Sequence, residues 1–251
     1  IRKQDLINDN KMKRGLNKLI FVTAVFALIL SIFVSCKKDK YYYDSGVIDP
    51  HYSGTIMQYL ESKPLQFDTL VQIIKLANLY DTLNTHTLTL FAPGDSSISR
   101  TIHYLDNYLQ SSGKPIITNL DQIKPEIWHK YLAMYIFKDK KLLADYPQVD
   151  FQNLAAFPGG YFNSLDGQLM NIGVVYNSSA GVAYQGYRQL YLNYFPDLSV
   201  PYAGLITDAV ASSDIQPTNG VIHALQFPNN YFGYDPDNFA IDAYKAGIDS
   251  L

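Results

Sequence analysis

Apolar residues recur every three to four positions where the globular part of the chain begins, near Ser53. This spacing predicts a short helix over Thr55–Glu61 and a longer amphipathic helix over Phe67–Leu79. Each helix has one apolar face, so each needs a sheet or another helix to cover it.

A strand and two further helices are expected next. Leucines alternate with threonines over Thr87–Phe91, as in a strand, and Pro93-Gly94 ends it. Asp95 is expected to cap a helix whose apolar stripe is Ile98, Ile102, Leu105 and Leu109. Pro125 stands where another helix would begin, with a buried face at Trp128, Leu132 and Tyr135.

Segments rich in β-forming residues dominate the second half. They are separated by Gly, Asn and Pro, and they are Leu169–Tyr176, Val182–Gln185, Leu205–Ser212 and Val221–Phe227. Asn219-Gly220 is a strong turn signal before the last one. Helices followed by strands predict an α+β fold.

The N-terminal region has a different pattern. Lys13, Arg14 and Lys18 precede an uncharged run of 16 residues, Leu19–Val34, and the small residue Ser35 follows it. A positive segment, an apolar segment and a small-residue boundary are typical of a cleavable secretory signal. The run is slightly shorter than the ~20 residues that cross a bilayer as a helix, so an uncleaved membrane anchor is the second interpretation.

Cys36 is the only cysteine of the chain and comes directly after this boundary. Residues 33–36 resemble the lipobox of bacterial lipoproteins, except that Phe33 stands where leucine is usual. The resemblance implies cleavage before Cys36 and lipidation of its thiol, and two or more acyl chains anchor a protein stably where one does not. A buried structural cysteine is the alternative.

The residues after Cys36 set the expected organisation. The charged stretch Lys37–Lys40 resembles the export signal that sends lipoproteins of the Bacteroidetes to the outer face of the outer membrane. We therefore expect a lipid-anchored, surface-exposed protein of the outer membrane. Its parts would be upstream residues and a signal at 1–35, a lipidated polar tether at 36–52, one domain at 53–227 and a C-terminal tail at 228–251.

Composition narrows the function. Hydrophobic residues make up 47% of the chain, and residues 36–251 carry 14 Lys/Arg against 21 Asp/Glu. Nucleic acid binding depends on clustered basic residues, so it is not expected here. A single cysteine excludes an intrachain disulfide and a thiolate metal cluster, and the chain has no phosphate-binding or nucleophile-elbow motif. No cofactor, metal site or catalytic residue is expected.

Two motifs resemble those of fasciclin domains. Thr89–Asp95 is similar to the first family motif, although Gly94 stands where threonine is usual. Asp214-Ile215 and Asn219–His223 are similar to the second. The expected helices fall in the family's order, so the resemblance covers about Ser53–Phe227.

This resemblance implies helices packed against a β-sandwich or wedge of mixed strands. It also implies structural roles for the motif residues Phe91, Pro93, Asp95, Asn219, Gly220 and His223, the last as a buried hydrogen-bonding residue. The Tyr-His pair implicated in integrin contact in animal members is replaced by Tyr135-Ile136, so that role is not implied.

Tyrosine is unusually frequent, with 21 residues and none before Tyr41. An insert-like segment contains the candidate ligand-binding residues Tyr184, Tyr187, Tyr191, Tyr194 and Tyr202. Flat rings with a polar tip suit recognition surfaces, including the stacking of sugars. Spacings of four and three would place Tyr187, Tyr191 and Tyr194 on one face of a short helix. The alternative is that these rings cover the sheet.

Three functions remain. The first is a non-enzymatic binding or adhesion lipoprotein that contacts a glycan or a protein of the envelope or matrix, as an accessory part of an outer-membrane nutrient-capture system. The second is a structural envelope protein without a soluble ligand. The third is a glycoside hydrolase, which needs two carboxylates at a spacing that one sequence does not reveal.

Overall fold

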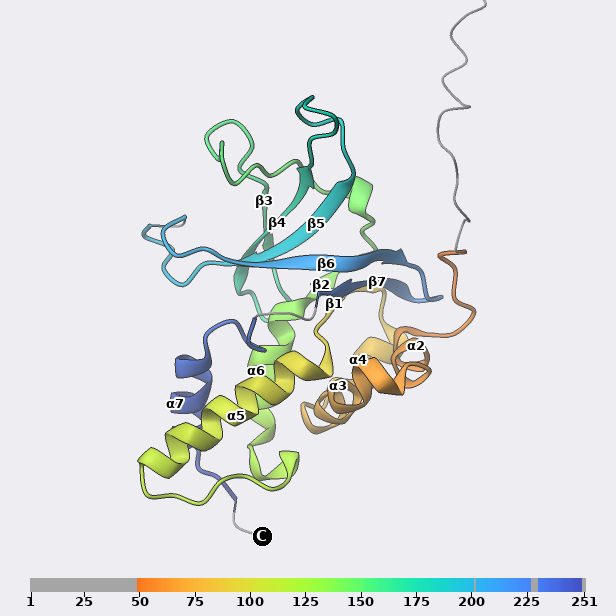
Figure 1. Ribbon diagram of the computed structural model, residues 1–251. Helices are drawn as coiled ribbons and strands as arrows, with labels where there is room; N and C mark the ends of the chain where they lie inside the picture. The colour runs from red at the N-terminus through yellow and green to blue at the C-terminus, as the bar shows by residue number, and fades with distance from the viewer. Residues whose placement is uncertain (1–48, 201, 227–229, 250–251) are drawn as a thin grey trace, which may run out of the picture. The chain divides into compact units, whose positions relative to one another are not determined.

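The computed structural model describes residues 49–200, 202–226 and 230–249, which Figure 1 shows in colour. These residues belong to one unit, Asp49–Leu251. Cys36, the expected signal and most of the tether lie outside the described residues. Within the described ranges, no helix has the length and apolar character needed to cross a membrane.

The helices expected from the apolar spacing are present. They are α2 (Ile56–Glu61), α3 (Pro64–Leu76), α5 (Asp95–Ser111) and α6 (Pro125–Leu132). Two further helices, α4 (Tyr80–Thr85) and α7 (Pro236–Ala246), were not expected. Three short 3-10 turns are also present. η2 (Leu120–Gln122) lies between α5 and α6, η3 (Ala133–Tyr135) between α6 and β2, and η4 (Leu143–Asp145) between β2 and β3.

A seven-stranded mixed sheet in the order β2-β1-β7-β6-β5-β4-β3 forms the rest of the fold. Its strands are β1 (Leu88–Ala92), β2 (Ile136–Lys138), β3 (Gly160–Asn163), β4 (Leu169–Tyr176), β5 (Arg188–Tyr194), β6 (Ile206–Ile215) and β7 (Gly220–Leu225). β1 and β7 run parallel, and the other neighbours are antiparallel. The α+β prediction is therefore confirmed.

The sheet has a helical side and an inner side. Leu90 and Ile222 are register partners in β1 and β7 and are fully buried on the side that carries the helices. Phe91 and His223 alternate with them and point the other way, where Tyr146 packs against both rings. Tyr146 also contacts Phe162 of β3, so the inner core lies between the two halves of a folded sheet. Figure 1 shows the helices below β1 and β7, and β3, β4 and β5 above them.

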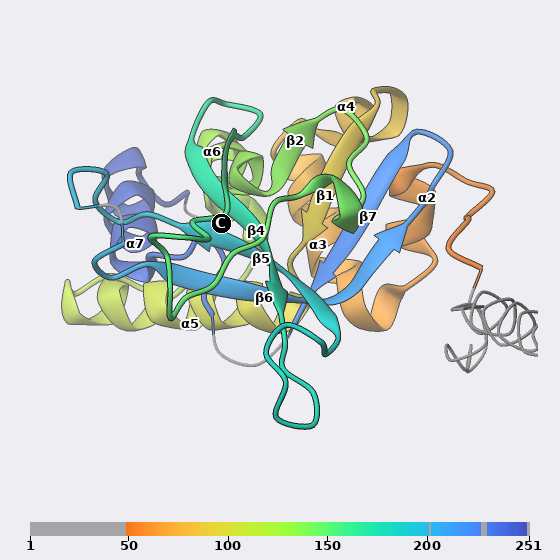
Figure 2. The same cartoon turned by 90° about the horizontal axis from the view of Figure 1, so that it is seen from above.

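The strand expected at residues 87–91 is present as β1. It is buried on both faces, because Thr89 is covered by the segment that follows β2 and donates from Oγ1 to the Asp139 carbonyl. Two other local predictions were wrong. The expected strand Val182–Gln185 is a loop in the long connection between β4 and β5, which projects from the sheet in Figures 1 and 2. The expected helix over Tyr187–Tyr194 is the strand β5.

The segment expected as a C-terminal tail is part of the core. Phe232, Phe239 and Ala243 are buried, and Phe239 lies 5.6 Å from the Trp128 ring centroid on α6. The Thr101 hydroxyl on α5 donates to the Phe232 carbonyl at 3.0 Å. The folded unit therefore extends through α7, which lies beside α5 in Figures 1 and 2.

Candidate functional site

The second sequence motif joins the helices to the sheet. The Asn219 amide group donates to the carbonyls of Leu83 and His86 at 2.9 and 3.1 Å, and its Oδ1 accepts from Ile56 N at 2.8 Å. Gly220 follows where β7 meets β1, and a Cβ there would lie 2.1 Å from the Leu88 carbonyl oxygen. Any larger residue would separate the two strands, so both motif residues have structural contacts.

Asp95 caps a helix, but not its own. The N-cap of α5 is Gly94, without a side-chain hydrogen bond. The Asp95 carboxylate instead accepts from Thr69 N and Leu70 N of α3, both at 3.0 Å. Helix α3 is kinked at Phe67, so its second part begins with N–H groups that lack partners within the helix. Asp95 thereby fastens α3 to the end of β1.

His223 is a neutral, fully buried residue. Its Nδ1 accepts from Asp214 N at 3.2 Å, which leaves Nε2 as the donor to the Lys141 carbonyl at 3.1 Å. Burial lowers the pKa of His223 to about 4, since a charged ring would lose its hydration. Phe91 lies against this ring at 4.9 Å, and Pro93 ends β1 in a buried position. These contacts hold the strands and leave His223 no free nitrogen for a ligand.

The five candidate tyrosines are separated by the structure. Tyr191 and Tyr194 are three residues apart in a strand, so their side chains point to opposite faces. Tyr194 stacks on Tyr234 with ring centroids 5.3 Å apart and is half-buried on the inner side. Tyr194 is thus a packing residue.

Tyr184 and Tyr191 contact the loop of residues 147–158. Tyr191 meets Phe151 edge to face at 5.2 Å, and Tyr184 meets Phe157 at 5.7 Å. The Tyr184 hydroxyl donates to Asp150 Oδ2 at 2.7 Å, which lowers the pKa of that carboxyl. These rings bind the loop to the sheet, in agreement with the covering alternative.

Two buried side-chain amides of the sheet also hold the loop of residues 147–158. Asn171 of β4 and Asn193 of β5 are register partners and fully buried. Asn193 Nδ2 donates to Asn171 Oδ1 at 2.8 Å, and Asn171 Nδ2 donates to the Pro158 carbonyl at 2.9 Å. This chain of hydrogen bonds ties the loop to β4 and β5, and Asn193 Oδ1 has no hydrogen-bond partner among the described residues. We call the side of β3, β4 and β5 that carries Asn171 and Asn193 the outer face.

Tyr202 belongs to an exposed aromatic cluster at the edge of the outer face. Tyr161 of β3 is 48% exposed, stacks on the buried Phe195 at 5.7 Å and has its hydroxyl 2.5 Å from that of Tyr202. The adjacent loop exposes Leu198 and Val200. We call these residues, Tyr161, Phe195, Leu198, Val200 and Tyr202, the aromatic platform.

Tyr161 was missed by the sequence reasoning because it stands outside the tyrosine-rich segment. Tyr161 lies near the tyrosine-rich segment only because β3 pairs with β4, where Tyr161 is opposite Asn171. Tyr187, by contrast, is 68% exposed at the far end of β5 and has no ring contact among the described residues.

No group of three or more His, Cys, Asp or Glu side chains in the described region is arranged to hold a metal ion. A hollow with a volume of about 420 Å³ lies between the edge strands β2 and β3. Its lining includes Lys138, Lys141 and Tyr146, which the sequence did not single out.

Comparison with known proteins gives one family. The fasciclin domain family matches residues 65–226 of this chain. Among solved structures, a domain pair from the insect cell adhesion molecule fasciclin I matches with a TM-score of 0.43 and 18% identity. That match covers 70% of this chain and 50% of the insect chain, so this chain spans half of that structure. No curated protein matches the chain.

Proposed function

The chain belongs to the fasciclin domain family, and from this premise we propose that it is a non-enzymatic, surface-anchored adhesion protein that binds a glycan through the aromatic platform. The observation that carries the proposal is the exposed ring of Tyr161, held between Phe195 and the Tyr202 hydroxyl. A ring fixed in this way offers a flat apolar face to a sugar and loses little conformational freedom on binding.

The polar groups around the platform suit the same ligand. The Tyr161 and Tyr202 hydroxyls lie at the rim, where each retains capacity for a further hydrogen bond. Asp197 is held in place by Ser199, whose N–H and hydroxyl donate to Asp197 Oδ1 at 2.8 and 2.7 Å, and these bonds lower the pKa of the carboxyl. A charged acceptor beside an aromatic ring matches the alternation of hydroxyls and apolar faces on a sugar.

The glycan proposal is tested with purified protein and a panel of soluble polysaccharides. Tyr161→Ala and Tyr202→Ala should each weaken binding on the order of tenfold, since binding energy concentrates in a few aromatic anchors. The matched control is Tyr244→Ala, which removes a tyrosine that is 38% exposed on α7. Equal weakening by the control would contradict the platform.

The remaining outcomes separate the other functions. Binding to none of the polysaccharides would favour a structural protein of the cell envelope. Turnover of a polysaccharide would instead identify a glycoside hydrolase.

The anchoring part of the proposal concerns Cys36. We place the protein on the outer membrane through lipid on this thiol, as an accessory component of a nutrient-capture system, because Cys36 directly follows the apolar run. In an expressing bacterium, labelled palmitate should enter the protein, and Cys36→Ala should abolish the label. Labelling of the variant at the level of the parent would contradict lipidation at this residue.

A further inference from the structure

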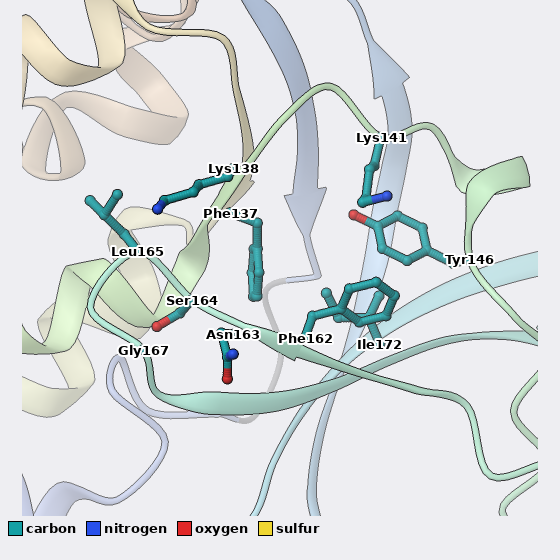
Figure 3. A pocket seen from close by; sticks show the side chains of 10 residues that line it. All are labelled: Phe137, Lys138, Lys141, Tyr146, Phe162, Asn163, Ser164, Leu165, Gly167 and Ile172. Atoms are coloured by element: carbon teal, nitrogen blue, oxygen red, sulfur yellow. The ribbon is translucent and has the colours of Figure 1, made fainter.

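The two edge strands of the sheet, β2 and β3, are joined at one end only. Leu165 N, in the turn after β3, donates to the Ile136 carbonyl of β2 at 2.8 Å. No other backbone hydrogen bond within the described ranges joins the two strands. Beyond this contact a cavity of about 420 Å³ lies between them (Figure 3). We call this space the edge cavity.

On β2, the backbone of Lys138 points away from β1. Its register partner Leu88 donates its own N–H to the Asn219 carbonyl, on the β7 side of β1, at 3.2 Å. In an antiparallel ladder, opposite residues exchange both hydrogen bonds or neither, and the two kinds of pair alternate. Leu88 and Lys138 are therefore a pair without mutual hydrogen bonds, so the N–H and C=O of Lys138 face the free edge.

On β3, Tyr161 and Asn163 also turn their backbone groups to the free edge. Ser164 N donates to the Gln168 carbonyl at 2.9 Å, so the Ser164 backbone faces β4. Alternation along the strand then directs the N–H and C=O of Asn163 and Tyr161 away from β4. No hydrogen bond from a described residue engages these groups or those of Lys138. Both edges therefore expose backbone groups with free bonding capacity.

Exposed groups of this kind accept an added strand. A segment in extended conformation can hydrogen-bond to a free sheet edge, while its alternate side chains enter pockets beside that edge. An antiparallel register continued from Leu165 and Ile136 would place Asn163 opposite Lys138, yet no hydrogen bond joins these two residues. The position beside β3 that an added strand would take is therefore open.

The lining of the edge cavity defines the side chains that such a strand would carry. Phe137 of β2, Phe162 of β3 and Ile172 of β4 form an apolar wall, which suits an apolar side chain. Lys138 and Lys141 are the charged residues of the lining, and no ion pair within the described ranges engages either ammonium group. Acidic side chains on the occupant would compensate both charges.

The placement of the two lysines favours an extended chain over one small anion. Figure 3 shows Lys138 on one side of the Phe137 ring and Lys141 on the other. The two ammonium groups are thus placed for separate anions. Side chains two residues apart in a strand lie about 7 Å apart on one face, so an extended segment can carry one acid to each lysine.

We propose that the edge cavity binds an extended, acidic segment of a partner protein. The segment adds as a strand to the free edge of β3 at Tyr161 and Asn163. One apolar side chain packs against Phe137 and Phe162, and acidic side chains before and after it face Lys138 and Lys141. The aromatic platform remains a separate site, because the side chains of Tyr161 and Phe162 alternate along β3 and point to opposite faces.

Amide hydrogen exchange followed by NMR tests the added strand. The probe is a peptide with blocked ends and the sequence Glu-Asp-Val-Thr-Val-Asp-Glu. At saturating peptide, exchange of the Tyr161 and Asn163 amides should slow on the order of tenfold or more. The Phe162 amide is the internal control, since it already faces β4 and its exchange should not change. Unchanged exchange at Tyr161 and Asn163 overturns the proposal.

The same exchange measurement identifies a different occupant. Without peptide, protection of Tyr161 and Asn163 that increases with protein concentration would assign the edge to a second copy of this chain. That result would overturn the proposal of a partner segment.

Peptide variants test the chemistry of the occupant by fluorescence anisotropy. Replacing every acid of the peptide by its amide should weaken binding on the order of tenfold, and added salt should weaken the acidic peptide. Methylation of the three central backbone nitrogens removes their hydrogen-bond donors and should abolish binding. Equal binding of the acidic peptide and of either variant overturns the proposal.

Protein variants place the peptide in the edge cavity. Lys138→Met and Lys141→Met should each weaken it on the order of tenfold. The matched control is Lys140→Met, because Lys140 is exposed in the same segment and outside the lining. Asn163→Pro removes an N–H that faces the free edge, where proline is tolerated, and should also weaken the peptide.

The lysine variants decide even if Asn163→Pro fails to fold, since Lys138 is exposed and Lys141 is half-buried. Equal weakening by Lys140→Met overturns the proposal. Polysaccharide binding by the aromatic platform should be the same in all three lysine variants, so failure of one proposal is distinguishable from failure of the other.

Discussion

At the scale of single residues, burial shifts two titratable groups in opposite directions. Burial raises the pKa of Asp208 to about 6, although a hydrogen bond from Asn230 opposes the shift. Burial lowers the pKa of His223 to about 4. In both cases the fold favours the neutral form, because burial removes the hydration that stabilises the charged form.

The two shifts have opposite effects on stability. Between about pH 4 and 6 the folded state holds the Asp208 proton more tightly than the unfolded chain does, so its contribution is lost as pH rises through about 6. Between about pH 6.5 and 4 the unfolded chain protonates His223 first, so stability is lost as pH falls. The contributions offset one another in the parent protein.

Substitution of one group should uncover the other. As the pH is raised from 4 to 6.5, the free energy of unfolding of Asp208→Asn should increase by roughly 2–3 kcal/mol relative to the parent. As the pH is raised over the same interval, the free energy of unfolding of His223→Gln should decrease by a similar amount relative to the parent. Urea denaturation at several pH values measures both slopes, and curves parallel to that of the parent would show that neither group titrates differently in the folded state.

At the scale of the elements, one carboxylate decides where α3 restarts after its kink. Asp95 accepts from Thr69 N and Leu70 N, which are the second and third N–H groups after the non-helical Phe67. An anion at this end also interacts favourably with the helix dipole. The contact joins α3 to the start of α5, between residues whose numbers differ by 26 and 25.

Asp95→Ala should lower the free energy of unfolding by about 2 kcal/mol, the upper part of the range for loss of a helix cap. Ser96→Ala removes the neighbouring exposed side chain and should change it by less than about 0.5 kcal/mol. Chemical denaturation gives both values. A loss for Asp95→Ala no larger than that for Ser96→Ala would mean that α3 does not depend on this cap.

At the scale of the whole molecule, α7 completes the helical layer. Phe239 is fully buried and contacts Trp128, Tyr131 and Phe232, with ring centroids 5.6, 4.9 and 6.2 Å away. The Tyr131 hydroxyl donates to Asp242 Oδ2 at 2.8 Å, which adds a polar contact between α6 and α7. The helix after β7 is thus packed into the same core as the helices before β2.

Phe239→Ala should therefore destabilise the domain as one unit. Loss of a buried phenylalanine costs about 3–5 kcal/mol, which corresponds to roughly 10 °C in melting temperature for a domain of this size. Tyr244→Ala on the same helix should have a much smaller effect, since that ring is partly exposed. Circular dichroism at 222 nm follows the transition, and a parent-like melt for Phe239→Ala would show that α7 folds independently of the core.

The sequence by itself determined the features that depend on local spacing. Apolar residues at helical intervals located α3, α5 and α6, and the turn signal at Asn219-Gly220 located the start of β7. The two motifs also indicated the family, because their residues make contacts that few other side chains could make. Gly220 meets a carbonyl oxygen where no Cβ fits, and Asn219 uses both ends of its amide.

Only the tertiary structure decided which distant residues meet. The spacing of Tyr187, Tyr191 and Tyr194 fits a helix, but pairing with β4 and β6 makes this segment a strand and sends Tyr194 into the core. Tyr161 meets Tyr202 across 41 residues of sequence, and Lys138, Lys141 and Ser164 line one cavity between β2 and β3. Strand order and register fix such contacts, and they depend on long-range packing that local periodicity does not encode.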